Sequence, residues 1–164
     1  MATTPGNLKM LNKFIVASLA TLWFSHAQAD VSAQRATEKT IVLTNQSAWQ
    51  IYEKYLSGWN NASEPERVKI ANNVVAEDVA YSTPRHTTGG RVTIIEDMAT
   101  FQKKYPGGHF EIGDVSAHDN YALLTWVLIL PDGKELARGH DAMRVSAEGK
   151  IVSMITFAPS VTKP

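Results

Sequence analysis

The sequence predicts an α+β domain in which helices come first and an antiparallel sheet follows. Before Gly108 the apolar residues recur every three or four positions, which is the spacing of helices that bury one face. After Gly108 apolar and polar residues alternate over four segments, which is the period of half-buried strands. Short turn sequences connect these four segments, so successive strands are expected to pair as antiparallel hairpins.

The first 29 of the 164 residues have the features of a removable export signal. Lys9 and Lys13 precede an apolar run, Phe14 to Phe24, that is shorter than the ~20 residues a helix needs to cross a bilayer. Residues 27–29 (Ala-Gln-Ala) then fit the small-x-small pattern of a cleavage site. A short membrane anchor and a disordered tail are the alternatives, and Met10 is a second candidate start of translation. We therefore expect a periplasmic or secreted protein with no membrane attachment after cleavage.

The remainder of the chain is long enough for one domain with its own hydrophobic core. We expect residues 30–44 to be a flexible lead-in and residues 45–160 to be the folded domain. Because the first 29 residues carry two lysines and no acid, the rest keeps 14 basic and 16 acidic residues, and it has no basic run. This charge argues against nucleic-acid binding. The absence of cysteine excludes disulfides and thiolate chemistry, so packing must stabilise the fold.

Capping signals and apolar stripes mark three helices. Ser47 to Gln50 fits a capping box, and a stripe of apolar residues continues from it to Trp59. Ser63, followed by a proline and a glutamate, opens a second and shorter helix. A third helix is predicted over residues 91–104, before a Pro-Gly-Gly sequence. The three predicted buried faces are Ala48, Ile51, Tyr52, Tyr55, Leu56 and Trp59; Val68, Ala71, Val74 and Val75; and Ile94, Ile95, Met98, Phe101 and Tyr105.

Five strands are expected, the first of them short. It covers residues 79–82 and precedes a polar loop. Glycines inside strands often mark a bulge or a bend, so Gly113 and Gly139 predict that the sheet curves. A curved sheet with helices on one face encloses a pocket. The four longer strands are predicted at residues 109–117, 121–130, 134–145 and 150–158.

Asp141 is the strongest candidate for a functional residue. It lies in the middle of a predicted strand and shares a face with Gly139, Met143 and Val145, because alternate strand residues point the same way. A carboxylate on an apolar face must be hydrogen-bonded, protonated or directed into a cavity. A cavity would make Asp141 a site residue. The structural alternatives are hydrogen bonds to nearby backbone or an ion pair with one of three arginines, Arg85, Arg91 and Arg138.

Four short motifs stand in order along the chain. They are Tyr52 to Leu56 with Trp59-Asn60, Ala76 to Tyr81, Pro84 with Gly89-Gly90, and Gly139 to Asp141 with Glu148 to Ile151. In this order and spacing they resemble the nuclear transport factor 2-like superfamily, and within it the SnoaL-like proteins and the ketosteroid isomerases. The resemblance covers residues 47–158. It implies a conical half-barrel, in which helices and a curved, mainly antiparallel sheet enclose a deep apolar pocket, and a homodimer through the sheet's outer face.

The resemblance also implies roles for individual residues. Asp141 falls where the isomerases place an aspartic acid that donates a hydrogen bond to the substrate oxygen, and where SnoaL-like cyclases place an acid/base. Tyr55 falls at the position of the isomerases' oxyanion-hole tyrosine. Thr83 occupies the position of their general-base aspartate, although threonine does not exchange protons near neutral pH. His86, three residues later, is the candidate replacement base.

Each of these residues also has a structural explanation. Tyr55 lies on an apolar helix stripe, where tyrosines usually belong to the core, and His86 fits a solvated loop. His140 alternates with Asp141 and should face away from the pocket. No histidine or carboxylate cluster and no phosphate-binding loop is recognisable, so we expect no metal and no cofactor. The candidate ligand-binding residues are Trp59, Thr83, Phe101, Trp126, Met143 and Phe157.

Three functional hypotheses follow for an exported protein of this kind. The first is an enzyme that binds a small apolar or aromatic carbonyl or hydroxyl compound. It would catalyse cofactor-free proton transfer as an isomerase, cyclase or dehydratase, using Asp141, Tyr55 and His86. The second is a carrier or sensor that binds the same class of compound without turnover, which Thr83 favours. The third is an interaction domain whose cavity no longer has a ligand.

Overall fold

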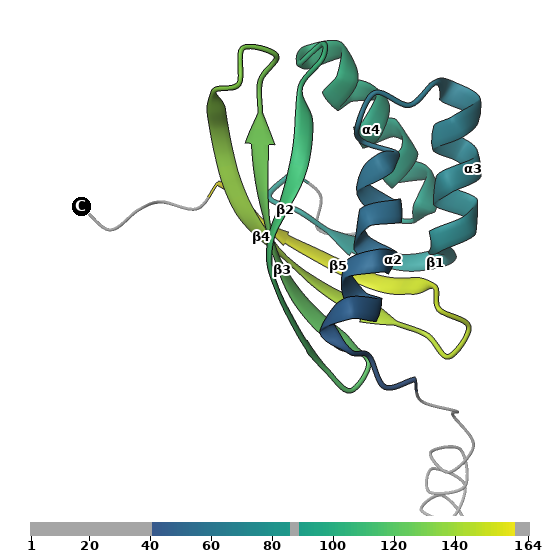
Figure 1. The fold of residues 1–164 in the computed structure, drawn as a ribbon. Coiled ribbons are helices and arrows are strands. Elements are labelled where there is room, and N and C mark those ends of the chain that lie inside the picture. Colours follow the sequence, from purple (N-terminus) through teal and green to yellow (C-terminus); the bar gives the residue numbers. More distant parts are fainter. Residues whose placement is uncertain (1–40, 86–88, 160–164) are drawn as a thin grey trace, which may run out of the picture. The chain divides into compact units, whose positions relative to one another are not determined.

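The computed structural model describes residues 41–85 and 89–159, and it confirms an α+β fold (Figure 1). Three helices, α2 (Asn45–Ser57), α3 (Glu64–Val74) and α4 (Arg91–Lys104), lie on one side of a curved sheet. The predicted signal at residues 1–29, most of the lead-in and His86 lie outside the described residues. None of the helices within the described ranges is long and apolar enough to cross a membrane.

The sheet has five strands and is open rather than closed into a barrel. They are β1 (Val75–Ser82), β2 (His109–His118), β3 (Tyr121–Ile129), β4 (Glu135–Val145) and β5 (Ile151–Phe157), arranged in the order β1-β5-β4-β3-β2. Strands β2 to β5 form the predicted antiparallel meander. The edge strand β1 pairs with β5 in parallel, so the sheet is mixed. The meander and the fold class were therefore predicted correctly.

Two helix boundaries differ from the prediction. Helix α2 is capped by Thr44, whose Oγ1 accepts a hydrogen bond from the Ser47 amide (3.1 Å), while Ser47 Oγ accepts one from the Thr44 amide (2.9 Å). Ser47 therefore closes the capping box as its fourth member and does not begin the helix. Val75, predicted at the end of the second helix, is the first residue of β1 and pairs with Ile151. The sheet there overrides the helical pattern, since Val favours a strand.

The two strand glycines act in different ways. The register between β2 and β3 shifts between Ile112 and Val115, so Gly113 lies in a bulge, as predicted. Gly139 causes no register shift between β3 and β4. Instead, a Cβ atom at Gly139 would collide with the Trp126 ring and would lie 2.5 Å from the Phe157 carbonyl oxygen. Glycine is thus required because the indole packs directly against the backbone of β4.

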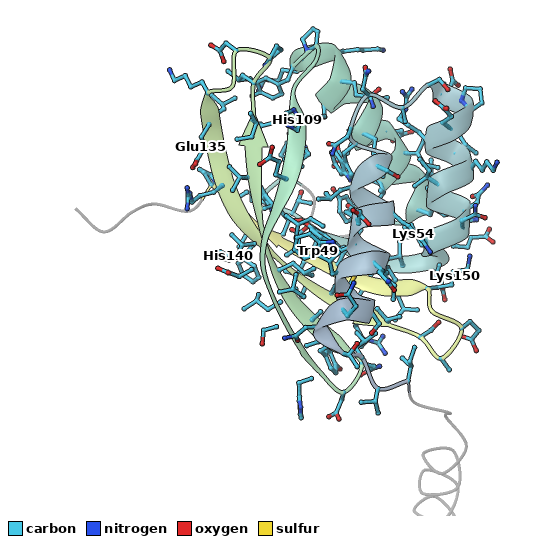
Figure 2. All side chains as sticks on the ribbon, viewed as in Figure 1. Trp49, Lys54, His109, Glu135, His140 and Lys150 are labelled. Atoms are coloured by element: carbon cyan, nitrogen blue, oxygen red, sulfur yellow. The ribbon has the colours of Figure 1, made fainter. Side chains whose placement is uncertain are left out.

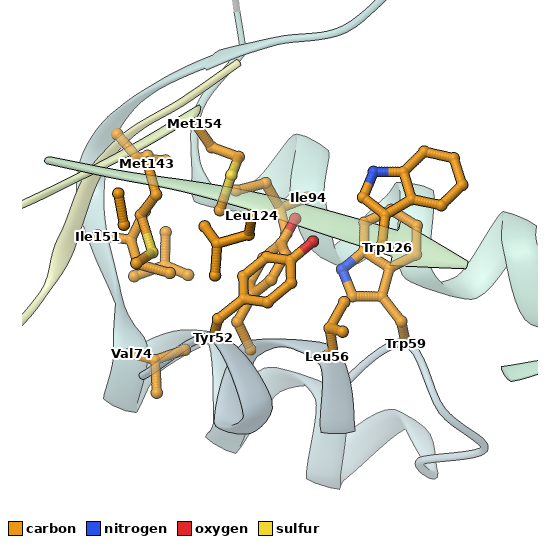
Figure 3. Close-up of a cluster of buried hydrophobic side chains, with 14 of the residues drawn as sticks. Tyr52, Leu56, Trp59, Val74, Ile94, Leu124, Trp126, Met143, Ile151 and Met154 are labelled. Atoms are coloured by element: carbon orange, nitrogen blue, oxygen red, sulfur yellow. The ribbon is translucent and has the colours of Figure 1, made fainter. Parts of the chain in front are cut away.

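The hydrophobic core fills one end of the space between helices and sheet. In Figure 3 Val74, Met143, Ile151 and Met154 gather on one side of Tyr52, and Leu56, Trp59 and Trp126 lie on the other. Tyr52 on α2 is fully buried between the two groups. The aliphatic group is therefore core, and the pocket lies on the aromatic side. Members of the aliphatic group include Val74, Leu124, Met143, Ile151 and Met154.

Candidate functional site

A pocket of about 390 Å³ lies between the helices and the concave face of the sheet. This volume is in the range of small-molecule sites. Its mouth is formed by the exposed residues Pro84, Arg85, Thr100, Lys104 and Pro159. Its buried walls are formed by Tyr52, Tyr55, Leu56, Trp59, Tyr81, Phe101, Trp126, Leu128 and Asp141.

Aromatic rings form a continuous wall of this pocket. Phe101 of α4 stacks near Phe110 of β2 with ring centroids 4.6 Å apart, and Phe110 meets Trp126 edge-on at 5.3 Å. Trp59 contacts both phenylalanines. Asn60 fixes this arrangement, because its side-chain amide exchanges two hydrogen bonds of 2.8 Å with the Phe110 backbone. The wall is therefore held in place and suits a bulky apolar or aromatic ligand.

Asp141 lies at the buried end of the pocket and is only 4% exposed. The Tyr52 hydroxyl donates a hydrogen bond to Oδ2 (2.7 Å), and the Trp126 indole Nε1 donates to Oδ1 (3.3 Å). Thr156, directly opposite Asp141 on β5, also lines the pocket. The three predicted alternative partners pair elsewhere: Arg85 with Asp97, Arg91 with Glu77 and Arg138 with Glu135. Asp141 is thus a buried acid that forms no ion pair with any residue the structure describes.

The surroundings favour the protonated form of Asp141. Burial raises the pKa of the Asp141 carboxyl, and the hydrogen bonds from Tyr52, Thr156 and Trp126 offset part of this rise. Burial, and after it the Asp141 charge, raises the pKa of Tyr52 and of Tyr55 well above the usual value. Both tyrosines therefore remain proton donors. The buried end of the pocket can accordingly donate hydrogen bonds to a ligand oxygen.

Tyr55 and Trp59 add two further donors to the wall. Trp59 Nε1 is buried and, among the described residues, has no acceptor at hydrogen-bonding geometry. It is still close enough to Tyr55 to lower the pKa of that hydroxyl, against the larger effects of burial and of Asp141. The contact between the Trp59 indole N–H and the Tyr55 hydroxyl does not have hydrogen-bond geometry, so it leaves the indole N–H unsatisfied. An oxygen atom of a ligand would provide the missing acceptor.

A second buried acid lies beside the pocket. Asp97 on α4 is 7% exposed and accepts a hydrogen bond from the Tyr81 hydroxyl (2.9 Å) through Oδ2. Arg85 lies 3.6 Å from the other carboxylate oxygen. Tyr81 and Arg85 both line the pocket, so Asp97 is connected to it through these two side chains.

The structure brings most of the predicted site residues together. Asp141, Tyr55, Trp59, Thr83, Phe101 and Trp126 all line the pocket. Met143 is enclosed by the core and does not line it. Phe157 is 56% exposed on the opposite face, where it pairs with His140. The expectation that Met143 and Phe157 would form pocket walls is therefore wrong, and no position can be given for His86.

The register of β5 explains the error at Phe157. Thr156 pairs with Asp141, so Thr156 shares the inner face and Phe157 the outer one. Figure 2 shows His140 on the side of the sheet away from the helices, as the alternation predicted. Within the described residues, no group of three or more potential ligand side chains is placed to hold a metal ion.

Sequence analysis did not assign functional roles to Tyr52, Tyr81, Asp97 or Thr156. For Asp97 a usable signal was present, because it interrupts the helix face formed by Ile94, Met98 and Phe101. An acid on a buried face was the same signal that singled out Asp141. No pattern in the sequence indicated that Tyr52, rather than Tyr55, bonds to Asp141.

With this geometry established, the chain can be placed in a family. The SnoaL-like domain family matches residues 52–154, and the chain belongs to it. A proposed isomerase of the SnoaL-like family from Agrobacterium tumefaciens is 28% identical, with a TM-score of 0.63 over 68% of this chain and 97% of that one. A search of curated proteins found no significant match.

Two more distant structures share the fold. An NTF2-like protein of unknown function from Exiguobacterium is 14% identical, with a TM-score of 0.55 over 68% of this chain and 99% of that one. A proposed ketosteroid isomerase from Kribbella flavida is 22% identical, with a TM-score of 0.53 over 73% of this chain and 82% of that one. At these identities the similarity concerns the fold alone.

The buried carboxyl predicts a pH-dependent effect of Asp141→Asn on stability. A carboxyl whose pKa is raised by folding contributes fully below its unfolded pKa, and the contribution is lost as pH rises through the folded pKa. Asparagine does not ionise, and it can accept from Trp126 while donating to Tyr52. The free energy of unfolding of the variant, relative to wild type, should therefore increase by on the order of 1 kcal/mol from pH 4 to pH 8.

Urea unfolding at several pH values measures this difference. Asp114→Asn, at an exposed position on β2, is the control and should show no such increase. A difference for Asp141→Asn that stays constant, or that falls as pH rises, would contradict a raised pKa.

Proposed function

We propose that this pocket binds a small, largely apolar or aromatic compound with a carbonyl or hydroxyl oxygen, and that Asp141 engages this oxygen as a proton donor. One observation carries the proposal: a carboxyl that is 4% exposed lies against an aromatic pocket and has no ion-pair partner in the described part of the chain. Burial of an acid without an ion-pair partner is costly, so such a group is typical of functional sites. Tyr52 orients the carboxyl by its 2.7 Å hydrogen bond.

The reaction that best suits this site is cofactor-free proton transfer at a carbon next to a carbonyl. A protonated carboxyl near the carbonyl oxygen stabilises the enol that forms when the neighbouring carbon loses a proton. Isomerisation, aldol-type cyclisation and dehydration all pass through such a species. The Agrobacterium tumefaciens relative, itself a proposed isomerase, supports this class of reaction. Tyr55 would assist as a second donor, and His86 stays a candidate base.

Hydrogen–deuterium exchange at carbon tests this activity without knowledge of the natural substrate. The protein is incubated in deuterated water with a panel of aryl ketones, cyclic enones and steroid ketones that includes β-tetralone, and deuterium uptake is followed by NMR. Asp141→Asn should slow the exchange by at least about tenfold (~1.4 kcal/mol), because an amide is a much weaker acid. Asp114→Asn is again the control. A smaller loss in a folded Asp141→Asn variant would refute the catalytic role.

A non-catalytic carrier or sensor is the second candidate function. It is favoured by Thr83, which lines the pocket at the position where the resemblance predicts a base. Under this alternative, ligand binding depends on Asp141, and no ketone that binds undergoes hydrogen–deuterium exchange at carbon.

We further propose that the protein is exported, on the sequence of its first 29 residues. Native mass spectrometry of protein purified from the export compartment tests both export and ligand binding. The expected result is a chain that begins at Asp30 and carries a carbonyl or phenolic compound. A full-length mass would refute cleavage. An empty protein whose melting temperature is unchanged by the ketone panel would refute the binding proposal.

A homodimer is proposed through the outer face of the sheet. Leu123 on β3, Ala142 on β4 and Ile155 on β5 are neighbours in register, and they form an apolar row. Tyr121 and Phe157 extend it on either side, and both are exposed. Figure 1 shows the helices on the other side of the sheet, so no helix among the described residues covers this row. An exposed apolar patch of this kind is typical of an interface, and a two-fold axis would pair it with itself.

A charge placed in this row should disrupt the dimer. Leu123→Glu and Ile155→Glu are each expected to give a monomer, because a dimer would bury two carboxylates without partners. Light scattering after size-exclusion chromatography measures the mass. Val92→Glu is the control, since Val92 is an exposed hydrophobic residue on α4. A monomeric wild type, or a dimer that tolerates both charges, would contradict the proposal.

A further inference from the structure

The site as described so far has an acid but no assigned base among the described residues. Thr83 stands where the resemblance predicts the base, and a hydroxyl of this kind does not take up a proton near neutral pH. A reaction that moves a proton away from carbon requires an acceptor within hydrogen-bonding reach of the ligand, directly or through one relay. The candidates for this acceptor and relay are the second buried acid, Asp97, and its hydrogen-bond partner Tyr81, which lines the pocket.

Asp97 is held in place by elements that also build the pocket. Helix α4 positions it between Ile94 and Phe101, on the face that packs against β1. The Tyr81 hydroxyl of β1 donates to its Oδ2 at 2.9 Å, and Arg85 approaches its Oδ1 at 3.6 Å. A guanidinium and a hydroxyl donor both interact favourably with carboxyl oxygens, so these two contacts hold the Asp97 side chain in one orientation.

Tyr81 connects Asp97 with the pocket. It is 3% exposed and lines the pocket, whereas Asp97 does not. Within residues 41–85 and 89–159, the titratable or charged groups that act on this cluster include Tyr55 from α2, Arg85 after β1 and Asp141 from β4. Both acids raise the pKa of Tyr55 and of Tyr81, although burial is the largest cause in each case. The two carboxyls thus act on the same group of buried hydroxyls.

We propose that the Tyr81 hydroxyl relays a proton between the ligand and Asp97, so that Asp97 supplies the basicity that Thr83 lacks. This inference rests on the proposed function and completes it.

In the proposed step, the ligand's carbon–hydrogen bond breaks and its electron pair becomes the enol double bond. The released proton goes to the Tyr81 oxygen while Tyr81's own proton moves to Asp97 Oδ2. Asp141 gives its proton to the carbonyl oxygen. Reprotonation at another carbon restores all three groups and completes an isomerisation.

A purely structural role is the competing explanation, in which Asp97 only holds Tyr81 and Arg85. Both explanations predict that replacing Asp97 harms the protein. They differ in whether the rate losses of the two single variants add up in the double variant, and in the pH dependence of the reaction. In a relay, Tyr81 and Asp97 act in the same step. The double variant should therefore lose no more of the reaction rate than either single variant.

The experiment compares Asp97→Asn, Tyr81→Phe and the double variant in the deuterium-exchange assay with β-tetralone and the other ketones of the panel. Asparagine can still accept the Tyr81 hydrogen bond, and phenylalanine retains the ring, so both variants should fold. Each single variant should lose at least about 100-fold in exchange rate, which is the usual contribution of acid–base groups. The double variant should lose no more. Glu96→Gln, the neighbouring exposed position on α4, is the matched control.

Binding and pH profiles separate a relay from a structural role. In a relay, the dissociation constant of the ketone, measured by thermal shift, should change by less than about threefold in Asp97→Asn, and the acidic limb of the wild-type pH–rate profile should disappear. If folded Asp97→Asn or Tyr81→Phe retains more than a tenth of the wild-type rate, the relay is refuted and the proposed function stands. Additive losses in the double variant also refute it. A wild type that exchanges no ketone refutes the catalytic proposal and the relay with it.

Discussion

The burial of the Asp141 carboxyl is the constraint on which the rest of the site depends. An acid in the middle of a central strand cannot lie at 4% exposure unless its oxygens are hydrogen-bonded or its proton is retained. The structure hydrogen-bonds both oxygens, because Tyr52 and Trp126 donate to them, and burial in apolar surroundings raises the carboxyl pKa. Tyr52 lies on α2, so its hydrogen bond to Asp141 holds α2 against the sheet.

The aromatic wall follows from the same constraint. Trp126 reaches Asp141 by packing over the backbone of β4, which only a glycine at position 139 allows. Its ring then continues through Phe110, Phe101 and Trp59, so one contact network serves both the hydrogen bond and the pocket surface. Such a wall keeps the surroundings of Asp141 apolar, and burial in these surroundings is the cause of the raised pKa.

The two buried acids differ in a way that suits acid–base chemistry. Asp141 accepts hydrogen bonds from a hydroxyl and an indole, whereas Asp97 faces the Arg85 guanidinium. Different surroundings for two carboxyls of one site are the means by which proteins assign one as acid and the other as base. The three tyrosines between or beside them retain their protons, since burial and nearby negative charge raise the pKa of each.

The fold class, the order of the elements and the position of Asp141 on a buried face could be predicted from the sequence. These properties follow from local periodicity, which the chain carries in helices such as residues 91–104 and in the alternation around Asp141. Which side chains meet depended on register and on helix packing. Thr156 and Phe157 exchange faces if β5 slips by one residue. Tyr52 and Tyr55 share a helix stripe, so which of them bonds to Asp141 depends on how α2 packs against the sheet. The link between Asp97 and the pocket likewise exists only once α4 packs on β1.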